Sequence, residues 1–239
     1  MRARLAPGVA TLAAAATLAV ALATSGCHLL NPESCHEISP TIQPLEPEML
    51  GTTDLPPPET VTTAVNIVKG TPNSFFTCEG RGYVVQPIDR VWAALSDPET
   101  TYLQNDPNGG TILDIATQTF EPTAVASVVF RVFYKNPTGF GFDVHYDLWT
   151  WMGWLEGSEA NPLELGLRTH KTCGTTHIQP MDGSITARPE DTADLPPDVT
   201  GATAIEMIYW LEAETQHQDN CNGTLQDQFN GIVHWLNTH

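Results

Sequence analysis

The stretch that decides the fold is YVVQPIDRVWAALSDPE, residues 83–99. Its first residues are typical of a strand, and Pro87 then opens a helix. Four apolar residues follow at the spacing that places them on one helical face: Ile88, Val91, Trp92 and Leu95. The helix is expected to end before Pro98, because a residue that precedes proline avoids the helical region. The stretch therefore predicts a strand that runs directly into a short amphipathic helix.

Strands are predicted on both sides of this helix, and the chain is predicted to end in a second helix. Alternating or continuous apolar runs mark the expected strands: residues 75–85, 112–120, 125–135, 142–152, 163–178 and 203–215. Between the last two, residues 179–201 are polar and rich in Asp and Pro, which predicts a loop. A terminal helix is predicted over residues 224–236 from its apolar stripe: Leu225, Phe229, Ile232, Val233 and Leu236.

The charges of one predicted hairpin suggest its register. Setting Lys135 opposite Asp143 places Arg131 opposite Asp147, and it leaves apolar pairs on the other face. This is the pattern of a sheet with one solvated side.

The first 27 residues indicate export. Arg2 and Arg4 precede an uncharged run that is rich in Ala and Leu and ends at Ser25-Gly26-Cys27. A basic start, an apolar centre and a small-residue exit are typical of a secretory signal. The exit resembles a bacterial lipobox, although Leu is usual where Thr24 stands. We therefore expect residues 1–26 to be a lipoprotein signal peptide and Cys27 to carry the lipid. The mature chain is then extracytoplasmic and anchored to a bacterial cell envelope, either facing the periplasm or on the outer membrane. The alternative is a retained membrane helix.

The region after Cys27 is predicted to be a tether. Residues 27–60 contain seven prolines and few aromatic residues, so they offer little apolar surface to offset the entropy lost on ordering. The folded domain is expected to cover residues 61–239. Within the tether, Cys35 is the exception, because a disulfide there would attach the tether to the domain.

The charge of the mature chain excludes some partners. Without residues 1–26 it carries 28 acidic and 8 basic residues, a formal net charge of −20. Such a chain repels phosphate backbones, so nucleic-acid binding is not expected. Adhesion to anionic lipid is equally unfavourable, which leaves the acyl chains on Cys27 as the membrane anchor.

Four cysteines remain once Cys27 is lipidated. They are Cys35, Cys78, Cys173 and Cys221. In an oxidising compartment four cysteines imply two disulfides, with three possible connectivities. No Cys-x-x-Cys pair is present, so no redox motif is predicted.

The stretch at residues 83–99 resembles the opening of the START/polyketide-cyclase (SRPBCC, helix-grip) superfamily. The resemblance is carried by eight residues: Pro87, Asp89, Val91, Trp92, Leu95, Asp97, Pro98 and Glu99. It implies an α+β fold in which a curved antiparallel sheet of about six to seven strands wraps around a long C-terminal helix. It also implies an apolar cavity that binds a lipid or another hydrophobic small molecule. The aromatic residues expected to line it are Phe130, Tyr134, Tyr146, Tyr209 and Phe229, and the alternative for each is ordinary core packing.

The same resemblance implies a disulfide pattern. In a helix-grip sheet the first strand lies beside the last and runs antiparallel to it, which brings Cys78 near Cys221. Cys35 is then left to pair with Cys173 and to draw the tether over the sheet. The competing pattern is Cys35–Cys78 with Cys173–Cys221.

Three clusters of side chains deserve a test against the structure. Asp143, His145 and Asp147 alternate on one predicted strand face, which suits a solvated charge ladder, a divalent metal site or an acid/base pair. His170, Cys173 and His177 have ligand-like spacing but mixed strand parity, so a zinc site is not expected. Trp149, Trp151 and Trp154 follow in the same predicted strand, and two of them share the face of Asp143 and Asp147. A bulge could turn them inward, the N-terminal segment could cover them, or they could form a surface for a partner.

The sequence leaves three functions open. The first is a binding protein for a hydrophobic small molecule, without a cofactor or metal. The second is an enzyme of the cyclase/dehydratase or hydrolase type that uses the same cavity. The third is an envelope interaction protein without a ligand, with the Trp-rich face as its contact. Hydrolase, P-loop and dinucleotide motifs are absent from the sequence, so catalysis is uncertain.

Overall fold

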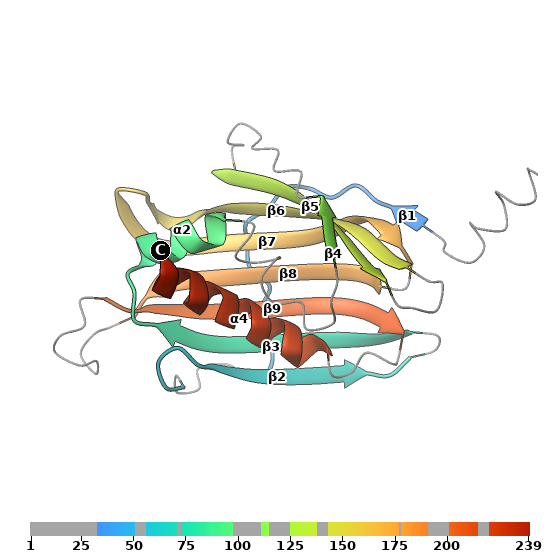
Figure 1. Ribbon diagram of the computed structural model, residues 1–239, viewed down its shortest axis with the longest axis horizontal. Coiled ribbons are helices and arrows are strands. Elements are labelled where there is room, and N and C mark those ends of the chain that lie inside the picture. Colours follow the sequence, from blue (N-terminus) through green and yellow to red (C-terminus); the bar gives the residue numbers. More distant parts are fainter. Residues whose placement is uncertain are drawn as a thin grey trace, which may run out of the picture.

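The fold is α+β, with a curved antiparallel sheet and a C-terminal helix (Figure 1). The computed structural model describes residues 33–50, 56–70, 73–97, 111–114, 125–137, 143–176, 178–190, 201–214 and 220–239. In these residues the strands are β1 (Glu33–Cys35), β2 (Val61–Val68), β3 (Asn73–Val84), β4 (Thr111–Asp114), β5 (Val128–Pro137), β6 (Asp143–Ser158), β7 (Asn161–Thr175), β8 (Ile178–Pro189) and β9 (Thr203–Glu214). The helices are α2 (Ile88–Ser96) and α4 (Asn220–Thr238).

The described strands form one sheet in the order β2-β3-β9-β8-β7-β6-β5-β4, and β1 pairs with the last residues of β7. The expectation of about six to seven strands is corrected to nine in the part of the chain that the structure describes. One additional strand is β8, which lies where a loop over residues 179–201 was predicted. Its polar residues hid an alternation in which Ile185 and Ala187 are buried. Gly183 interrupts that alternation because the ring of Tyr209 lies across it, where a Cβ atom would clash.

One face of the sheet, here called the helix face, packs against α2 and α4. Both helices agree with their predicted positions, and α4 extends beyond residues 224–236 at both ends. Gly82 of β3 lets α4 approach closely, since a Cβ atom there would lie 2.8 Å from the ring of Phe229. The Cys78–Cys221 disulfide then bonds the start of α4 to β3. Figure 1 shows α4 as a diagonal helix in front of the sheet, with α2 beside its C-terminal end.

The predicted register of the β5–β6 hairpin is wrong by two residues. Arg131 lies opposite Trp149, and Lys135 lies opposite His145. A shift of two residues keeps every side chain on its predicted face, because strand side chains alternate with a period of two. Arg131 still forms its ion pair with Asp147, now as a diagonal neighbour. Asp147 is nevertheless buried rather than solvated.

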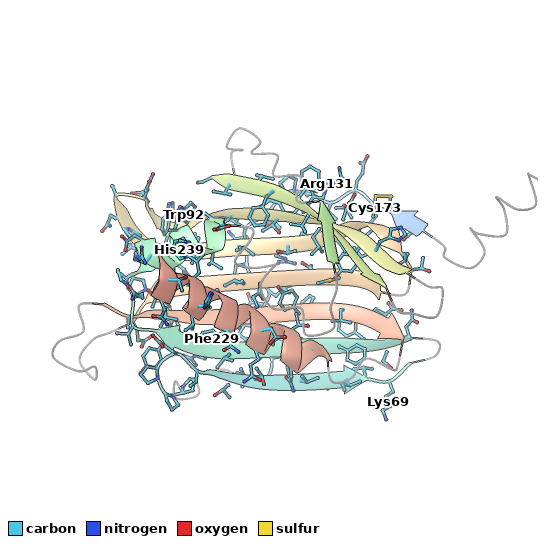
Figure 2. The ribbon with its side chains drawn as sticks, in the orientation of Figure 1. Lys69, Trp92, Arg131, Cys173, Phe229 and His239 are labelled. Atoms are coloured by element: carbon cyan, nitrogen blue, oxygen red, sulfur yellow. A yellow bond between two sulfur atoms is a disulfide. The ribbon has the colours of Figure 1, made fainter. Side chains whose placement is uncertain are left out.

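The opposite face of the sheet is crossed by residues 33–50, here called the N-terminal strap. Composition alone predicts a Pro-rich tether with too little apolar surface to become ordered, and this segment differs from that prediction, whereas the Cys35–Cys173 pairing was expected to draw it over the sheet. Its Ile42, Leu45 and Leu50 side chains are buried, and the Cys35–Cys173 disulfide attaches it to β7 (Figure 2). The favoured disulfide pattern is therefore the one present. The disulfide reduces the conformational entropy that this Pro-rich segment loses when it becomes ordered. A prediction from composition alone does not include that effect.

The strap crosses the strands along one row of register partners. Directly opposite residues run from Glu79 of β3 through Ile208, Ser184 and Arg168 to Trp151 of β6. With increasing residue number, the strap contacts this row from the Trp151 end towards the Glu79 end. Ile42 packs with Trp151, the Gln43 carbonyl oxygen accepts from Arg168 Nη1 at 2.8 Å, and the Leu45 N–H donates to Ser184 Oγ at 3.0 Å.

The strap also answers the question raised by the tryptophans. Trp151 is buried beneath Ile42, with the half-buried Trp149 beside it. Trp154 has the opposite parity and stacks on Trp92 of α2, with ring centroids 4.5 Å apart. Of the three alternatives, the covering N-terminal segment is the one observed for Trp149 and Trp151.

A buried carboxylate holds the end of the strap. Glu79 is 1% exposed, and its two oxygens accept hydrogen bonds from consecutive backbone N–H groups. The Glu48 N–H donates at 2.5 Å, the Met49 N–H at 3.0 Å and the Leu50 N–H at 2.8 Å. Hydrogen bonds to a charged acceptor are stronger than neutral ones, so Glu79 fixes a segment that has no ladder of its own there.

We expect Glu79→Gln to lower the free energy of unfolding by about 1–3 kcal/mol, because the neutral amide accepts these N–H groups more weakly. Urea unfolding measures the loss, and limited proteolysis should cut within residues 36–50 sooner than in the wild type. Glu37→Gln is the control, because it makes the same charge change at an exposed strap position. Equal stability of the two variants would contradict the anchoring role.

Candidate functional site

The candidate site lies on the helix face, and register establishes which residues share that face. Directly opposite residues run from Cys78 through Tyr209, Gly183 and Thr169 to Thr150 and then to Phe130. Cys78 is bonded to α4, so the whole row faces the helices. Phe130 and Tyr209 were predicted to share one apolar face, and the register agrees.

Two of the predicted cavity residues are packed against or within α4. Phe229 is fully buried, and its ring lies against Gly82. Tyr209 is buried beside it, and its hydroxyl donates a hydrogen bond to Gln228 Oε1 at 2.8 Å. Both belong to the main core cluster. Figure 2 labels Phe229 on α4, in front of the sheet. In this structure these two side chains hold the helix to the sheet.

Two others belong to a separate apolar cluster on β5 and β6. Its four buried members are Phe130, Val132, Tyr146 and Leu148. Val128 and Met181 pack against its edge. Among the described residues, none from α2 or α4 belongs to this cluster, here called the β5–β6 cluster. Tyr134 lies opposite Tyr146 in register, but its side chain falls outside the described part of the structure.

A buried lysine borders the β5–β6 cluster. Lys171 of β7 lies directly opposite Leu148 and is only 2% exposed. Its Nζ donates a hydrogen bond to the Thr175 carbonyl oxygen at 2.5 Å, and it lies 6.0 Å from the centroid of the Tyr146 ring. Burial lowers the pKa of Lys171 to about 8 from its ordinary value of 10.5. At neutral pH the side chain is thus still mainly a cation, placed at the border of a buried apolar cluster.

Two buried threonines lie next to Lys171 on the same face of the sheet. Thr169 lies two residues before Lys171 on β7, and Thr150 is its register partner on β6. Their hydroxyl groups are 3.0 Å apart and hydrogen-bonded. The helix face therefore carries a short polar row, Lys171, Thr169 and Thr150, beside the β5–β6 cluster.

Of the set His170, Cys173 and His177, Cys173 holds the strap together with the neighbouring Arg168. Arg168 donates to Asp182 through Nε at 2.7 Å and Nη2 at 2.5 Å, and His170 Nδ1 lies 3.1 Å from the same carboxylate. Burial lowers the pKa of His170 and outweighs the carboxylate of Asp182, which raises it. Cys173 is in a disulfide. In the described residues no group of three or more His, Cys, Asp or Glu could hold a metal ion.

Some predicted positions fall outside the described residues, namely Cys27, the whole of residues 1–26, and His177. The side chain of Asp143 is also outside them. Among the described helices, none is long and apolar enough to span a membrane.

Sequence reasoning missed Lys171. The signal was strand parity, since Lys171 shares the parity of Leu165 and Leu167, which face the core. A lysine in phase with the apolar residues of a strand departs from the usual alternation. The neighbouring His170 and Cys173 drew attention instead, because their spacing looks like that of metal ligands.

Comparison with known proteins gives similarity of structure at low identity. No family model matches the chain, and no curated protein matches it. A putative uncharacterized protein from Rhizobium leguminosarum is 11% identical, with a TM-score of 0.43, over 75% of this chain and 98% of that one. CalU16 from Micromonospora echinospora is 12% identical, with a TM-score of 0.37, over 75% of this chain and 87% of that one. Neither similarity assigns a function.

The pKa of Lys171 predicts how stability depends on pH. Between about pH 8 and 10.5 the unfolded chain binds more protons than the folded chain at this residue, so this residue makes folding more favourable as pH rises. Lys171→Met should therefore be more stable than the wild type at pH 7.5, by about 1–3 kcal/mol, and the difference should shrink towards pH 10.5. Urea unfolding at both pH values measures it. The exposed Lys69→Met is the control. The difference between its free energy of unfolding and that of the wild type should be the same at both pH values.

Proposed function

We propose that this protein is a lipid-anchored, extracytoplasmic binding protein that holds a hydrophobic small molecule in a helix-grip arrangement between its sheet and its C-terminal helix. The observation that carries the proposal is the β5–β6 cluster. It lies on the same sheet face as α4, yet within the part of the chain that the structure describes its members come from strands. The apolar surface under α4 is occupied by the helix's own side chains, such as Phe229.

The ligand is expected to contact Phe130 and Tyr146 rather than Tyr209 and Phe229. The second pair fastens α4, since Tyr209 is hydrogen-bonded to Gln228 and Phe229 fills the space above Gly82. Displacing either would open the core. Phe130 and Tyr146 form the aromatic wall of the β5–β6 cluster, and Lys171 supplies a polar end. This division assigns the ligand to the β5–β7 part of the helix face.

The export part of the proposal is supported by the disulfides. Two disulfides indicate an oxidising, extracytoplasmic environment. Cys35 lies eight residues after Cys27. Eight extended residues span at most about 29 Å. A lipid on Cys27 would therefore hold the Cys173 end of β7, and with it Lys171, near the membrane surface.

An enzyme using the same residues is the second candidate, favoured by Lys171. A buried amine whose pKa is lowered to about 8 can serve as a proton donor or acceptor. The third candidate used the tryptophan-rich face as a contact surface. That form of it is not retained, because Trp151 is buried under the strap.

Tyr146→Trp should weaken uptake of an uncharged fluorescent probe, N-phenyl-1-naphthylamine, because the larger ring fills the proposed ligand site. Overpacking of this kind costs about 1–3 kcal/mol of stability, which the domain should tolerate. Tyr83→Trp makes the same change on the opposite sheet face, one residue from the helix-facing Val84, and should bind the probe like the wild type. If both variants bind it equally, the assignment to the β5–β6 cluster is wrong.

Cys27→Ser should abolish acylation, because the Cys27 sulfur is the atom that would carry the lipid. Metabolic labelling with a radioactive fatty acid in an expressing bacterium measures it, and the wild type should be labelled. Cys35→Ser leaves Cys27 in place and should still be labelled. Persistent labelling of the Cys27→Ser protein would refute the anchor.

A further inference from the structure

We infer that the Cys35–Cys173 disulfide is a reducible latch, which a dithiol opens to release the first part of the strap while the Cys78–Cys221 disulfide stays closed. The site is thus one of thiol–disulfide exchange, and the partner is a dithiol reductant. Two observations carry this inference, namely the unequal exposure of the two disulfides and the unequal packing of the two parts of the strap.

The two disulfides differ in their access to solvent. Cys35 is exposed and Cys173 is half-buried. Cys78 is 0% exposed and Cys221 is 4% exposed, and both belong to the main core cluster. Thiol–disulfide exchange requires a thiolate to reach one of the two sulfur atoms, so a dithiol reduces a buried disulfide slowly. Figure 2 shows the Cys35–Cys173 bond next to β1.

The second part of the strap, residues 42–50, is held by burial and by hydrogen bonds to side chains of the sheet. Ile42, Leu45 and Leu50 are buried. The Leu50 N–H donates to the buried carboxylate of Glu79 at 2.8 Å. Here called the foot, this part has contacts that do not involve the Cys35–Cys173 disulfide.

The first part of the strap, residues 33–41, is packed less deeply and is here called the head. Among its described side chains none is buried, and Ile38 is half-buried against the cluster that contains Trp151. The three residues of β1 pair with β7, and the His36 N–H donates to the Thr172 carbonyl oxygen at 2.9 Å. A short segment without buried side chains opens at low free-energy cost unless it is cross-linked. The head therefore depends on the disulfide more than the foot does.

The exchange balances with one dithiol for each latch. One thiolate of the dithiol attacks the sulfur of the exposed Cys35, the S–S bond breaks, and its electron pair leaves on the sulfur of Cys173. The second thiol of the dithiol then attacks its own partner sulfur in the mixed disulfide and releases Cys35. The dithiol loses two electrons and two protons and becomes a disulfide, while Cys35 and Cys173 become thiols.

Opening the latch would lengthen the tether between the membrane and the domain, and this consequence rests on the proposed lipid at Cys27. With the disulfide closed, the eight residues from Cys27 to Cys35 span at most about 29 Å. With the head released, the first buried strap residue is Ile42, fifteen residues after Cys27, and the span rises to at most about 54 Å. Reduction would thus let the domain move further from the membrane surface.

The first test follows reduction of the folded chain by dithiothreitol at neutral pH without denaturant. N-ethylmaleimide stops the reaction, and peptide mass mapping measures the alkylation of each cysteine over time. Cys35 and Cys173 should be alkylated roughly tenfold or more faster than Cys78 and Cys221, because the second pair is reached only when the core opens. The urea-unfolded chain is the control, in which both disulfides should be reduced at similar rates.

The second test asks whether reduction releases the head. A Glu-specific endoproteinase can cut after Glu37 in the head and after Glu48 in the foot. Dithiothreitol should accelerate cleavage after Glu37 about tenfold or more and change cleavage after Glu48 by less than about threefold, because cleavage follows the population of the opened segment. The double variant Cys35→Ser/Cys173→Ser lacks the latch, so it should be cut quickly after Glu37 with or without dithiothreitol.

The outcomes separate the latch from the proposed function. If both disulfides of the folded chain are reduced at the same rate, or if reduction leaves cleavage after Glu37 unchanged, the latch is wrong, whereas the lipid anchor and ligand binding are unaffected. If fatty-acid labelling shows that Cys27 is not acylated, the anchor and the change in tether length are wrong. The latch then still stands on the rates of reduction and cleavage.

Discussion

Two consecutive residues of β3 fix the layers on both sides of the sheet. Cys78 and Glu79 point to opposite faces, because strand side chains alternate. Cys78 is bonded to Cys221 at the start of α4, and Glu79 binds three backbone N–H groups at the end of the strap. The helix face and the strap face are therefore both attached to one strand, β3, which lies next to the edge strand β2. The packing of α4 on one face of the sheet and of the strap on the other depends on this arrangement.

The two faces are used differently. On the strap face, arginine, serine and glutamate side chains of successive strands bind the backbone of a segment that crosses them, so polar groups serve as attachment points. On the helix face, α4 covers only part of the sheet, with close contacts at Gly82. Farther along the same face, the buried apolar cluster of β5 and β6 borders the buried Lys171. That asymmetry within one face is the basis on which a ligand is proposed for this region.

The structure also assigns roles to residues of similar appearance. Phe229 and Tyr209 are aromatic and buried, like Phe130 and Tyr146. The first pair holds a helix, whereas the second pair clusters, among the described residues, with side chains from strands. His170 and Lys171 are adjacent, yet one helps to hold the strap face and the other faces the helices. Neighbouring residues in a strand serve different layers, so residue type alone does not indicate function.

The sequence by itself determined the elements with strong periodicity. The strand and helix at residues 83–96 and the terminal helix follow from local patterns, and the resemblance at residues 83–99 implied the neighbouring first and last strands and thus both disulfides. Only the tertiary structure decided the rest. Residues 178–189 form a strand although Asp182 and Gly183 weaken the pattern, because Arg168 binds Asp182 and the Tyr209 ring covers Gly183. The strap folds because partners far away in sequence satisfy its backbone, and Lys171 gains its significance from burial, which no local spacing encodes.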